Sequence, residues 1–110
     1  MSIPSSAVFE DDTQLDEMAE NAKRATALLK ALGHEGRLMI LCYLASGEKS
    51  VTALEDLLSL RQPAVSQQLA RLRADNIISP RRDGKTIYYS ISDERARRLM
   101  EVVYELFCED

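Results

Sequence analysis

Hydrophobic residues recur at helical spacing along most of this chain, and one short hairpin interrupts them. Intervals of three or four residues predict helices over residues 12–32, from residue 52 onward, and from residue 93 to the end. Residues 35–45 are apolar on nearly every side, which is typical of a buried helix. The pattern therefore predicts a mainly α-helical protein with a β-hairpin.

Residues 61–75, RQPAVSQQLARLRAD, predict a short helix with two different faces. Val65, Leu69 and Leu72 form an apolar stripe, and the opposite face is small, polar or cationic. Serine, glutamine and arginine have the donors and acceptors that contact base edges and phosphates in DNA. The outer face therefore suits a DNA groove, although the same residues also suit an ordinary solvated helix.

The helix that begins near residue 52 and the short turn after it form a helix-turn-helix with the helix over residues 61–75. Thr52 and Glu55 match a capping box at the start of that helix. Residues 59–61 form only a short turn, and they lack the glycine that is often found there. Two short helices joined in this way predict a helix-turn-helix.

A basic hairpin is expected directly after the helix-turn-helix. Residues 77–82 and 85–91 predict its two strands, and Asp83-Gly84 matches a two-residue turn. This pairing sets Arg82 opposite Lys85 at the tip. Such a hairpin is a wing, which contacts the minor groove or nearby phosphates.

In the same register Pro80 lies opposite Ile87 on the core side of the hairpin. A proline has no N–H for the sheet ladder, so it also indicates an edge strand. After the hairpin, Ser92 is the expected cap of the last helix.

The first and last helices each carry a strong apolar stripe that one small domain leaves uncovered. Pairing of these two helices across a two-fold axis would cover both stripes at once. The chain is therefore predicted to be a homodimer through its first and last helices. The two recognition helices would then lie ~34 Å apart and bind a pseudo-palindromic operator in double-stranded DNA.

The net charge of −4 hides an uneven distribution. Residues 61–85 carry a net charge of +4, and the remainder carries −8. A basic patch on an acidic body is typical of a protein that binds a polyanion at one place. An enzyme is not expected, because the chain has no glycine-rich phosphate loop and only one histidine, His34, which suits a helix start.

The 110 residues suit a single domain. Residues 1–11 are acidic and lack periodic apolar positions, so they predict a disordered N-terminal tail before a folded domain over residues 12–110. No apolar run is long enough to span a membrane, and the N-terminus lacks the features of a signal peptide. The expected location is the cytoplasm, with no membrane partner.

The order of these elements, together with the stretch VSQQLARLR…RRDGKTIYYSI, resembles the ArsR/SmtB family of bacterial winged-helix repressors. The resemblance covers residues 20–108. It implies a winged helix-turn-helix homodimer that blocks transcription until an inducer weakens its hold on DNA. By position, it implies DNA contacts on the recognition helix and the wing, from Gln62, Ser66, Gln67, Gln68, Arg71, Arg82 and Lys85.

Metal-sensing members of this family carry cysteines in the helix before the recognition helix, or histidine and acidic ligands along the last helix. Here residues 52–57 hold no cysteine, and the last helix holds no histidine. Zn²⁺ and Cu⁺ sites favour imidazole or clustered thiolates. No metal site and no cofactor are therefore expected, and a metal-sensing repressor is only a second alternative.

Cys42 and Cys108 resemble the cysteine pair of the persulfide-sensing, SqrR/BigR-type branch, in the local sequences L-C-x-L and L-F-C. In that branch, reactive sulfur species join the two cysteines through a di- to tetrasulfide, and the repressor releases DNA. A plain disulfide needs Cα atoms within about 7 Å, whereas a polysulfide spans a wider gap. On the residues alone, the commoner role of such a cysteine is a small buried hydrophobe.

Other functions remain open at this stage. The same thiols suit a general redox sensor of peroxide or disulfide stress, and the same DNA surface suits an anti-repressor that displaces another protein. A winged helix that binds only proteins is compatible with the chain's negative net charge.

Overall fold

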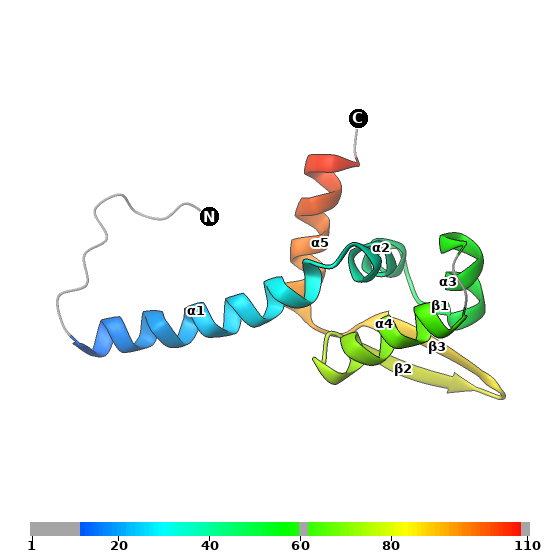
Figure 1. Cartoon of the computed structure of the whole chain (residues 1–110), viewed down its shortest axis with the longest axis horizontal. Helices are drawn as coiled ribbons and strands as arrows, with labels where there is room; N and C mark the ends of the chain where they lie inside the picture. Colours follow the sequence, from blue (N-terminus) through cyan, green and yellow to red (C-terminus); the bar gives the residue numbers. More distant parts are fainter. Residues whose placement is uncertain (1–11, 60–61, 109–110) are drawn as a thin grey trace.

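The computed structural model describes residues 12–59 and 62–108, and it is a winged helix-turn-helix as predicted (Figure 1). The residues of the predicted tail, 1–11, lie outside this description. Helices α3 and α4 form the helix-turn-helix, and strands β2 and β3 form the wing. The elements follow in the order α1 (Asp12–Leu32), α2 (Glu35–Leu44), β1 (Lys49–Ser50), α3 (Val51–Leu58), α4 (Gln62–Ala74), β2 (Ile78–Asp83), β3 (Thr86–Ile91) and α5 (Glu94–Phe107).

The core lies between α2, α3, α4, the base of the hairpin and the first half of α5. Val65, Leu69 and Leu72 of α4 are at most 2% exposed, so the predicted apolar stripe of the recognition helix is confirmed. Their largest neighbours in the core are also less than 2% exposed, namely Ile40, Leu41, Leu54, Ile77 and Met100. This packing holds α4 by one face and leaves its other face to solvent.

Helix α2 is less buried than its composition suggests. Ile40, Leu41 and Leu44 are buried, whereas Met39 is 41% exposed and Cys42 is only partly buried. The prediction of burial on every side is therefore wrong, because a small domain covers this helix mainly on one face.

The hairpin pairs in a register two residues away from the predicted one. Asp83 pairs with Thr86, so Gly84 and Lys85 form the turn, and Arg82 lies opposite Ile87. Gly84 has a φ of 63°, the positive value that a type II′ turn requires at its first central position. A shift of two residues keeps every side chain on its expected face, since strands alternate with period two.

The sheet has a third strand that the sequence analysis missed. β1 pairs with β3 through Tyr88 and Tyr89, which gives the strand order β1-β3-β2. Its two residues are too few to show an alternating pattern. β2 is an edge strand, as Pro80 predicts, but Pro80 itself is exposed because the strand leaves the core after Ile78.

Helix α3 begins two residues earlier than a Thr52 capping box would require. The Ser50 hydroxyl caps it by accepting a hydrogen bond from the Ala53 N–H at 3.1 Å, so the Thr52 prediction is wrong. At the other end, Ser59 adopts a left-handed conformation with a φ of 53°, and its N–H donates to the Glu55 carbonyl. A serine thus makes the turn at which a glycine is often found.

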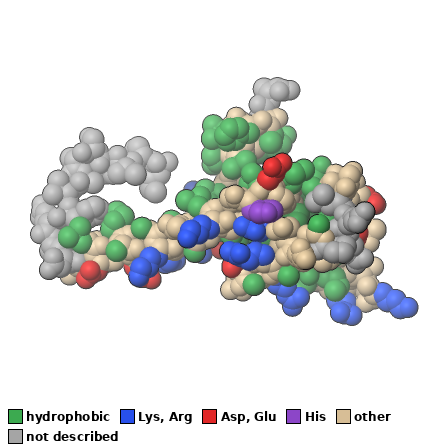
Figure 2. Space-filling model, viewed as in Figure 1, with side chains coloured by type: hydrophobic (Ala, Val, Ile, Leu, Met, Phe, Trp, Pro, Cys, Tyr) green, Lys and Arg blue, Asp and Glu red, His purple; other side chains and the backbone are tan. Residues whose placement is uncertain are grey.

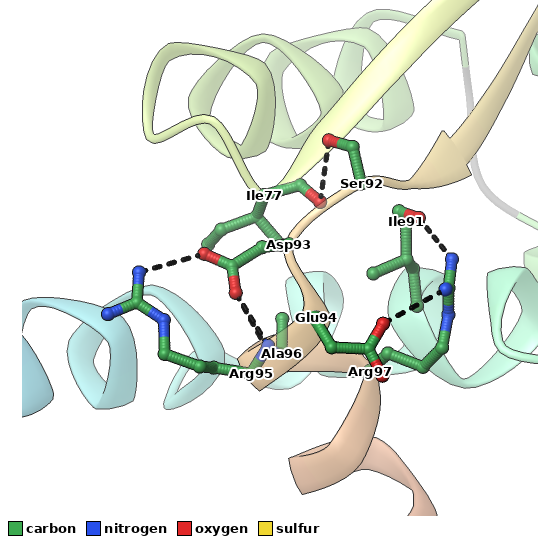
Figure 3. Close-up of polar contacts among 8 residues, drawn as sticks. All are labelled: Ile77, Ile91, Ser92, Asp93, Glu94, Arg95, Ala96 and Arg97. Carbon is green, nitrogen blue, oxygen red and sulfur yellow. Dashed lines mark hydrogen bonds and ion pairs between the residues drawn. The ribbon is translucent and has the colours of Figure 1, made fainter.

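Helix α5 is capped by Asp93 and not by Ser92 (Figure 3). The Asp93 carboxylate accepts hydrogen bonds from the N–H groups of Arg95 and Ala96, at 2.8 and 3.1 Å. Ser92 instead donates to the Ile77 carbonyl at 3.4 Å, which ties the chain after β3 to the residue before β2. The path out of the sheet therefore decides which of two adjacent candidates caps the helix.

Helix α1 and the free end of α5 extend away from the core and carry exposed apolar side chains (Figures 1 and 2). On α1, Leu15, Met18 and Leu29 are 50, 47 and 56% exposed. On α5, Leu106 and Phe107 are 70 and 80% exposed. One chain alone leaves these surfaces in contact with water. Among the described residues, no helix is both long and apolar enough to cross a membrane.

Candidate nucleic-acid interface and thiol pair

The outer face of α4 presents short polar side chains to solvent. Ser66 and Gln67 are exposed, while Val65 and Leu69 beside them are buried. The helix is thereby fixed in its rotation, and its polar side chains have room to approach a partner. The side chain of Gln62 lies outside the part of the chain that the structure describes.

Gln68 has a different environment from its neighbour Gln67. It is partly buried, and its side-chain oxygen accepts a hydrogen bond from the Arg37 guanidinium of α2 at 3.3 Å. Its amide is therefore turned toward α2, away from the outer face of the helix. This placement favours a structural role over the DNA contact expected for Gln68.

Arg71 lies one turn further along α4 and pairs with Asp75 at 2.9 Å. The two side chains are 54 and 37% exposed, and an exposed pair of this kind contributes under about 1 kcal/mol. A phosphate group would compete with Asp75 for the guanidinium at little cost.

The tip of the wing presents two cations. Arg82 and Lys85 are both exposed, and Figure 2 shows blue side chains gathered at the outer end of the hairpin. In the observed register Lys85 lies in the turn itself, and Arg82 lies in β2, three residues before Lys85. The wing therefore offers a positive tip on the same molecule as the polar face of α4.

Arg81, which the sequence analysis did not select, connects the wing to the loop before β1. Its Nε donates to both carboxylate oxygens of Glu48 at 3.1 Å, and its guanidinium lies 4.8 Å from the centre of the Tyr88 ring. This hydrogen bonding lowers the pKa of Glu48 and raises that of Arg81, so both groups stay charged. Residue spacing could not reveal a pair that is 33 positions apart.

A Glu48→Gln variant is expected to bind DNA more tightly, because Arg81 loses an anionic partner and becomes available to a phosphate. We expect a gain of about two- to fivefold in affinity for random-sequence DNA at low salt, and a steeper salt dependence. Fluorescence anisotropy over a salt series measures both. A Glu20→Gln variant on α1 changes the net charge equally, and the same gain in that control would contradict a specific role for the Glu48–Arg81 pair.

The two cysteines lie on α2 and at the end of α5. Cys42 is partly buried against the core, and Cys108 is exposed, with its N–H bonded to the Tyr104 carbonyl at 2.9 Å. Burial raises the pKa of the Cys42 thiol, and the nearby Cys108 raises it further. The helices that carry the two cysteines pack against each other, and both thiols are free.

A groove of about 430 Å³ opens beside Cys42, between the end of α2 and the outer half of α5. Its walls are formed by Cys42, Ala45, Ser46, Met100, Glu101, Tyr104 and Glu105. The groove is large enough for a small donor molecule to reach the partly buried sulfur.

Histidine and carboxylates do not form a metal site in the residues that the structure covers, since no group of three or more potential ligands occurs there. His34 caps α2, and its Nδ1 accepts a hydrogen bond from the Arg37 N–H at 3.3 Å. The interpretation of this histidine as a helix-start residue is confirmed.

Comparison with known proteins agrees with this geometry. The family model described as "Bacterial regulatory protein, arsR family" matches residues 34–79, which span α2, α3 and α4. The biofilm growth-associated repressor of Agrobacterium fabrum is 46% identical over 94 residues, covering 86% of this chain and 80% of that protein. The chain belongs to the ArsR family.

Solved structures of ArsR-family relatives have the same fold. The transcriptional activator HlyU of Vibrio cholerae, in its reduced form, superimposes with a TM-score of 0.83 at 40% identity, covering 84% of this chain and 98% of that one. The repressor BigR of Xylella fastidiosa gives a TM-score of 0.79 at 39% identity, covering 86% and 97%. The winged helix-turn-helix prediction and the ArsR assignment are therefore confirmed, and the chain is a DNA-binding transcription regulator and not an enzyme.

Proposed function

We propose that this ArsR-family regulator is a homodimeric repressor that acts in the cytoplasm and releases its operator when reactive sulfur species crosslink Cys42 and Cys108. One observation carries the proposal: in a DNA-binding regulator, two free thiols lie on α2 and at the end of α5, which pack against each other. The relatives known as biofilm growth-associated repressors support the choice of a repressor.

For the DNA interface, we propose that Ser66, Gln67 and Arg71 enter the major groove and that Arg82 and Lys85 contact flanking phosphates. The exposure of these side chains supports this division, as does the burial of the opposite face of α4. Gln62 remains in the proposed set by its position at the start of the helix. The operator is expected to be pseudo-palindromic because a two-fold dimer carries two identical recognition helices.

A Leu106→Glu variant is expected to weaken the dimer, because Leu106 is 70% exposed in the single chain and would be buried in the proposed interface of α1 and α5. Burial of an unpaired carboxylate should raise the dimer dissociation constant at least about tenfold. Sedimentation equilibrium measures this constant. The control Leu57→Glu introduces the same charge at an exposed leucine of α3, and equal dissociation of both variants would argue against the proposed interface.

The proposed chemistry needs no oxidant besides the sulfur donor. A cysteine thiolate attacks the outer sulfur of a persulfide RSSH, which forms a cysteine persulfide and releases the thiol RSH. Condensation of that persulfide with the second cysteine thiol yields a disulfide and H₂S, and condensation of two cysteine persulfides yields a trisulfide and H₂S. A donor with a longer sulfur chain extends the bridge to a tetrasulfide. The donor sulfur is reduced to H₂S as the cysteine sulfurs are oxidised.

Cys108 is proposed to react first, because it is exposed whereas burial disfavours the thiolate of Cys42. The raised pKa of Cys42 has a consequence for the second step. If the Cys42 thiolate attacks the persulfide on Cys108, crosslinking should accelerate as the pH rises toward that pKa, while the donor reacts with Cys108 independently of Cys42.

A second candidate function is anti-repression, which the activator HlyU favours by its similarity to this chain. An anti-repressor would use the same DNA surface but would raise transcription by displacing another protein. Transcription from the selected operator in a purified system separates the two, because only a repressor lowers it without a competitor.

The test of sensing is DNA-binding anisotropy of the reduced protein, repeated after glutathione persulfide and after hydrogen peroxide, with intact mass recorded for each sample. A sulfur sensor loses about 5- to 150-fold in affinity with persulfide and gains bridging sulfur mass. Equal loss with peroxide and a decrease of two hydrogens would indicate a general thiol redox sensor instead. No change with either reagent would refute a thiol switch of any kind.

A further inference from the structure

Arg37, the third residue of α2, joins three helices through one guanidinium group. Its Nε donates to the Ala31 carbonyl at 2.7 Å, and one terminal nitrogen donates to the Lys30 carbonyl at 3.1 Å. The other terminal nitrogen donates to the side-chain oxygen of Gln68 on α4 at 3.3 Å. The last turn of α1, the start of α2 and the middle of the recognition helix therefore share one planar group.

The bonds to α1 lie where that helix leaves the domain. Ala31 and Leu32 are buried at 1 and 7% exposure, Leu28 still packs against the core, and the part of α1 before it extends away from the core (Figure 1). The last carbonyls of a helix have no partner within the helix and carry partial negative charge. A guanidinium satisfies two of them at fixed angles, so it orients α1 at its point of attachment.

The bond to α4 lies where the start of α2 faces the recognition helix. A Cβ on Gly36 would be at ordinary contact distance from the Gln68 Cγ, 3.8 Å, so the start of α2 lies directly beside Gln68. Gln68 is partly buried at this point, one position away from the exposed Gln67. Arg37 thus connects the placement of α4 to that of α1.

We infer that Arg37 is a positioning residue that sets the separation of the two recognition helices in the dimer, and with it the spacing between the half-sites of the operator. The inference rests on the proposed function, because α1 joins the protomers and α4 enters the DNA there. The angle between α1 and α4 then fixes how far apart the two α4 helices lie. Arg37 does not need to contact DNA for this role. Gln68 contributes by accepting the hydrogen bond that connects Arg37 to α4.

The test is selection of binding sites from a random-sequence duplex library by the full-length wild-type protein and by Arg37→Met and Gln68→Met. The wild type should enrich two half-sites at a single spacing. Both variants should enrich the same half-site sequence with a broader range of spacings, with the preference for the wild-type spacing over neighbouring ones reduced about tenfold, the scale of losing a charged hydrogen bond. The double variant should lose no more than Arg37→Met alone, because both changes break one connection.

The control Arg24→Met removes a cation of α1 outside this connection and should keep the wild-type spacing. If Arg37 had a purely structural role, Arg37→Met would lower the melting temperature and would weaken binding to every spacing alike. A variant that keeps the wild-type preference for one spacing would overturn the inference. If Arg37→Met fails to fold, Gln68→Met carries the test, since it leaves both bonds to α1 in place. If the sequences selected by the wild-type protein contain no paired half-sites, the operator is not bound by a two-fold dimer, and the inference fails with the proposed function.

Discussion

Cys42→Ser and Cys108→Ser will each bind operator DNA as tightly as the reduced wild type, and neither will release it when persulfide is added. The bridge needs a sulfur atom on α2 and another on α5, so one serine is enough to prevent it. We expect the wild type to lose about 5- to 150-fold in affinity on treatment and each variant to lose less than about twofold. Anisotropy on reduced and treated protein measures the ratio.

The control for this experiment is Ala45→Ser, which adds a hydroxyl to the groove beside Cys42 without removing a thiol. It should remain fully responsive to persulfide. A single-cysteine variant that still releases DNA would exclude the two-thiol mechanism. Mass spectrometry of the Cys42→Ser protein adds a check on the order of reaction, because Cys108 should still gain one sulfur atom.

Gln67→Ala will weaken binding to the selected operator about 5- to 150-fold and leave binding to random DNA nearly unchanged. Gln67 is exposed on the outer face of α4, and a glutamine that bonds two atoms of a base contributes about 1–3 kcal/mol to discrimination. Competition anisotropy with both DNA types gives the specificity ratio, which should decrease by the same factor.

Arg82→Ala is the matched contrast at the wing. It should weaken binding to both DNA types alike. It should also reduce the slope of log affinity against log salt concentration by about one, as loss of a phosphate contact does. Equal losses on both DNA types for Gln67→Ala would mean that this residue does not contact bases. A winged helix that binds only proteins would show no effect of either change.

Local patterns in the sequence were sufficient to predict the helices and the hairpin, though not β1, and most of the exposed polar face of α4. The spacing of Val65, Leu69 and Leu72 identified the buried side of α4, because a helix of fixed period has one face for a core. The same spacing therefore predicted that Ser66 and Gln67 face solvent. The order of the helices and the hairpin was also sufficient to predict the fold and to identify the family.

Where the sequence offered two possible turns or two possible helix caps, the tertiary structure decided which one formed. Asp83-Gly84 and Gly84-Lys85 are both acceptable turns, and the pairing of Ile78 with Ile91 in the core selected the second. Ser92 and Asp93 are both good caps, and the path of the chain out of β3 selected Asp93. In each case the sequence offered alternatives of similar local energy, and packing separated them.

Contacts between distant residues were decided by the fold alone. Glu48 meets Arg81 and Arg37 meets Gln68 across more than 30 positions, so no periodicity connects them. The sequence by itself determined that this protein has a polar recognition helix, a basic wing and two cysteines on separate helices. Only the tertiary structure decided that Gln68 turns inward, that Arg81 is paired and that the helices carrying the two cysteines pack together, because these facts depend on where helices and strands meet in space.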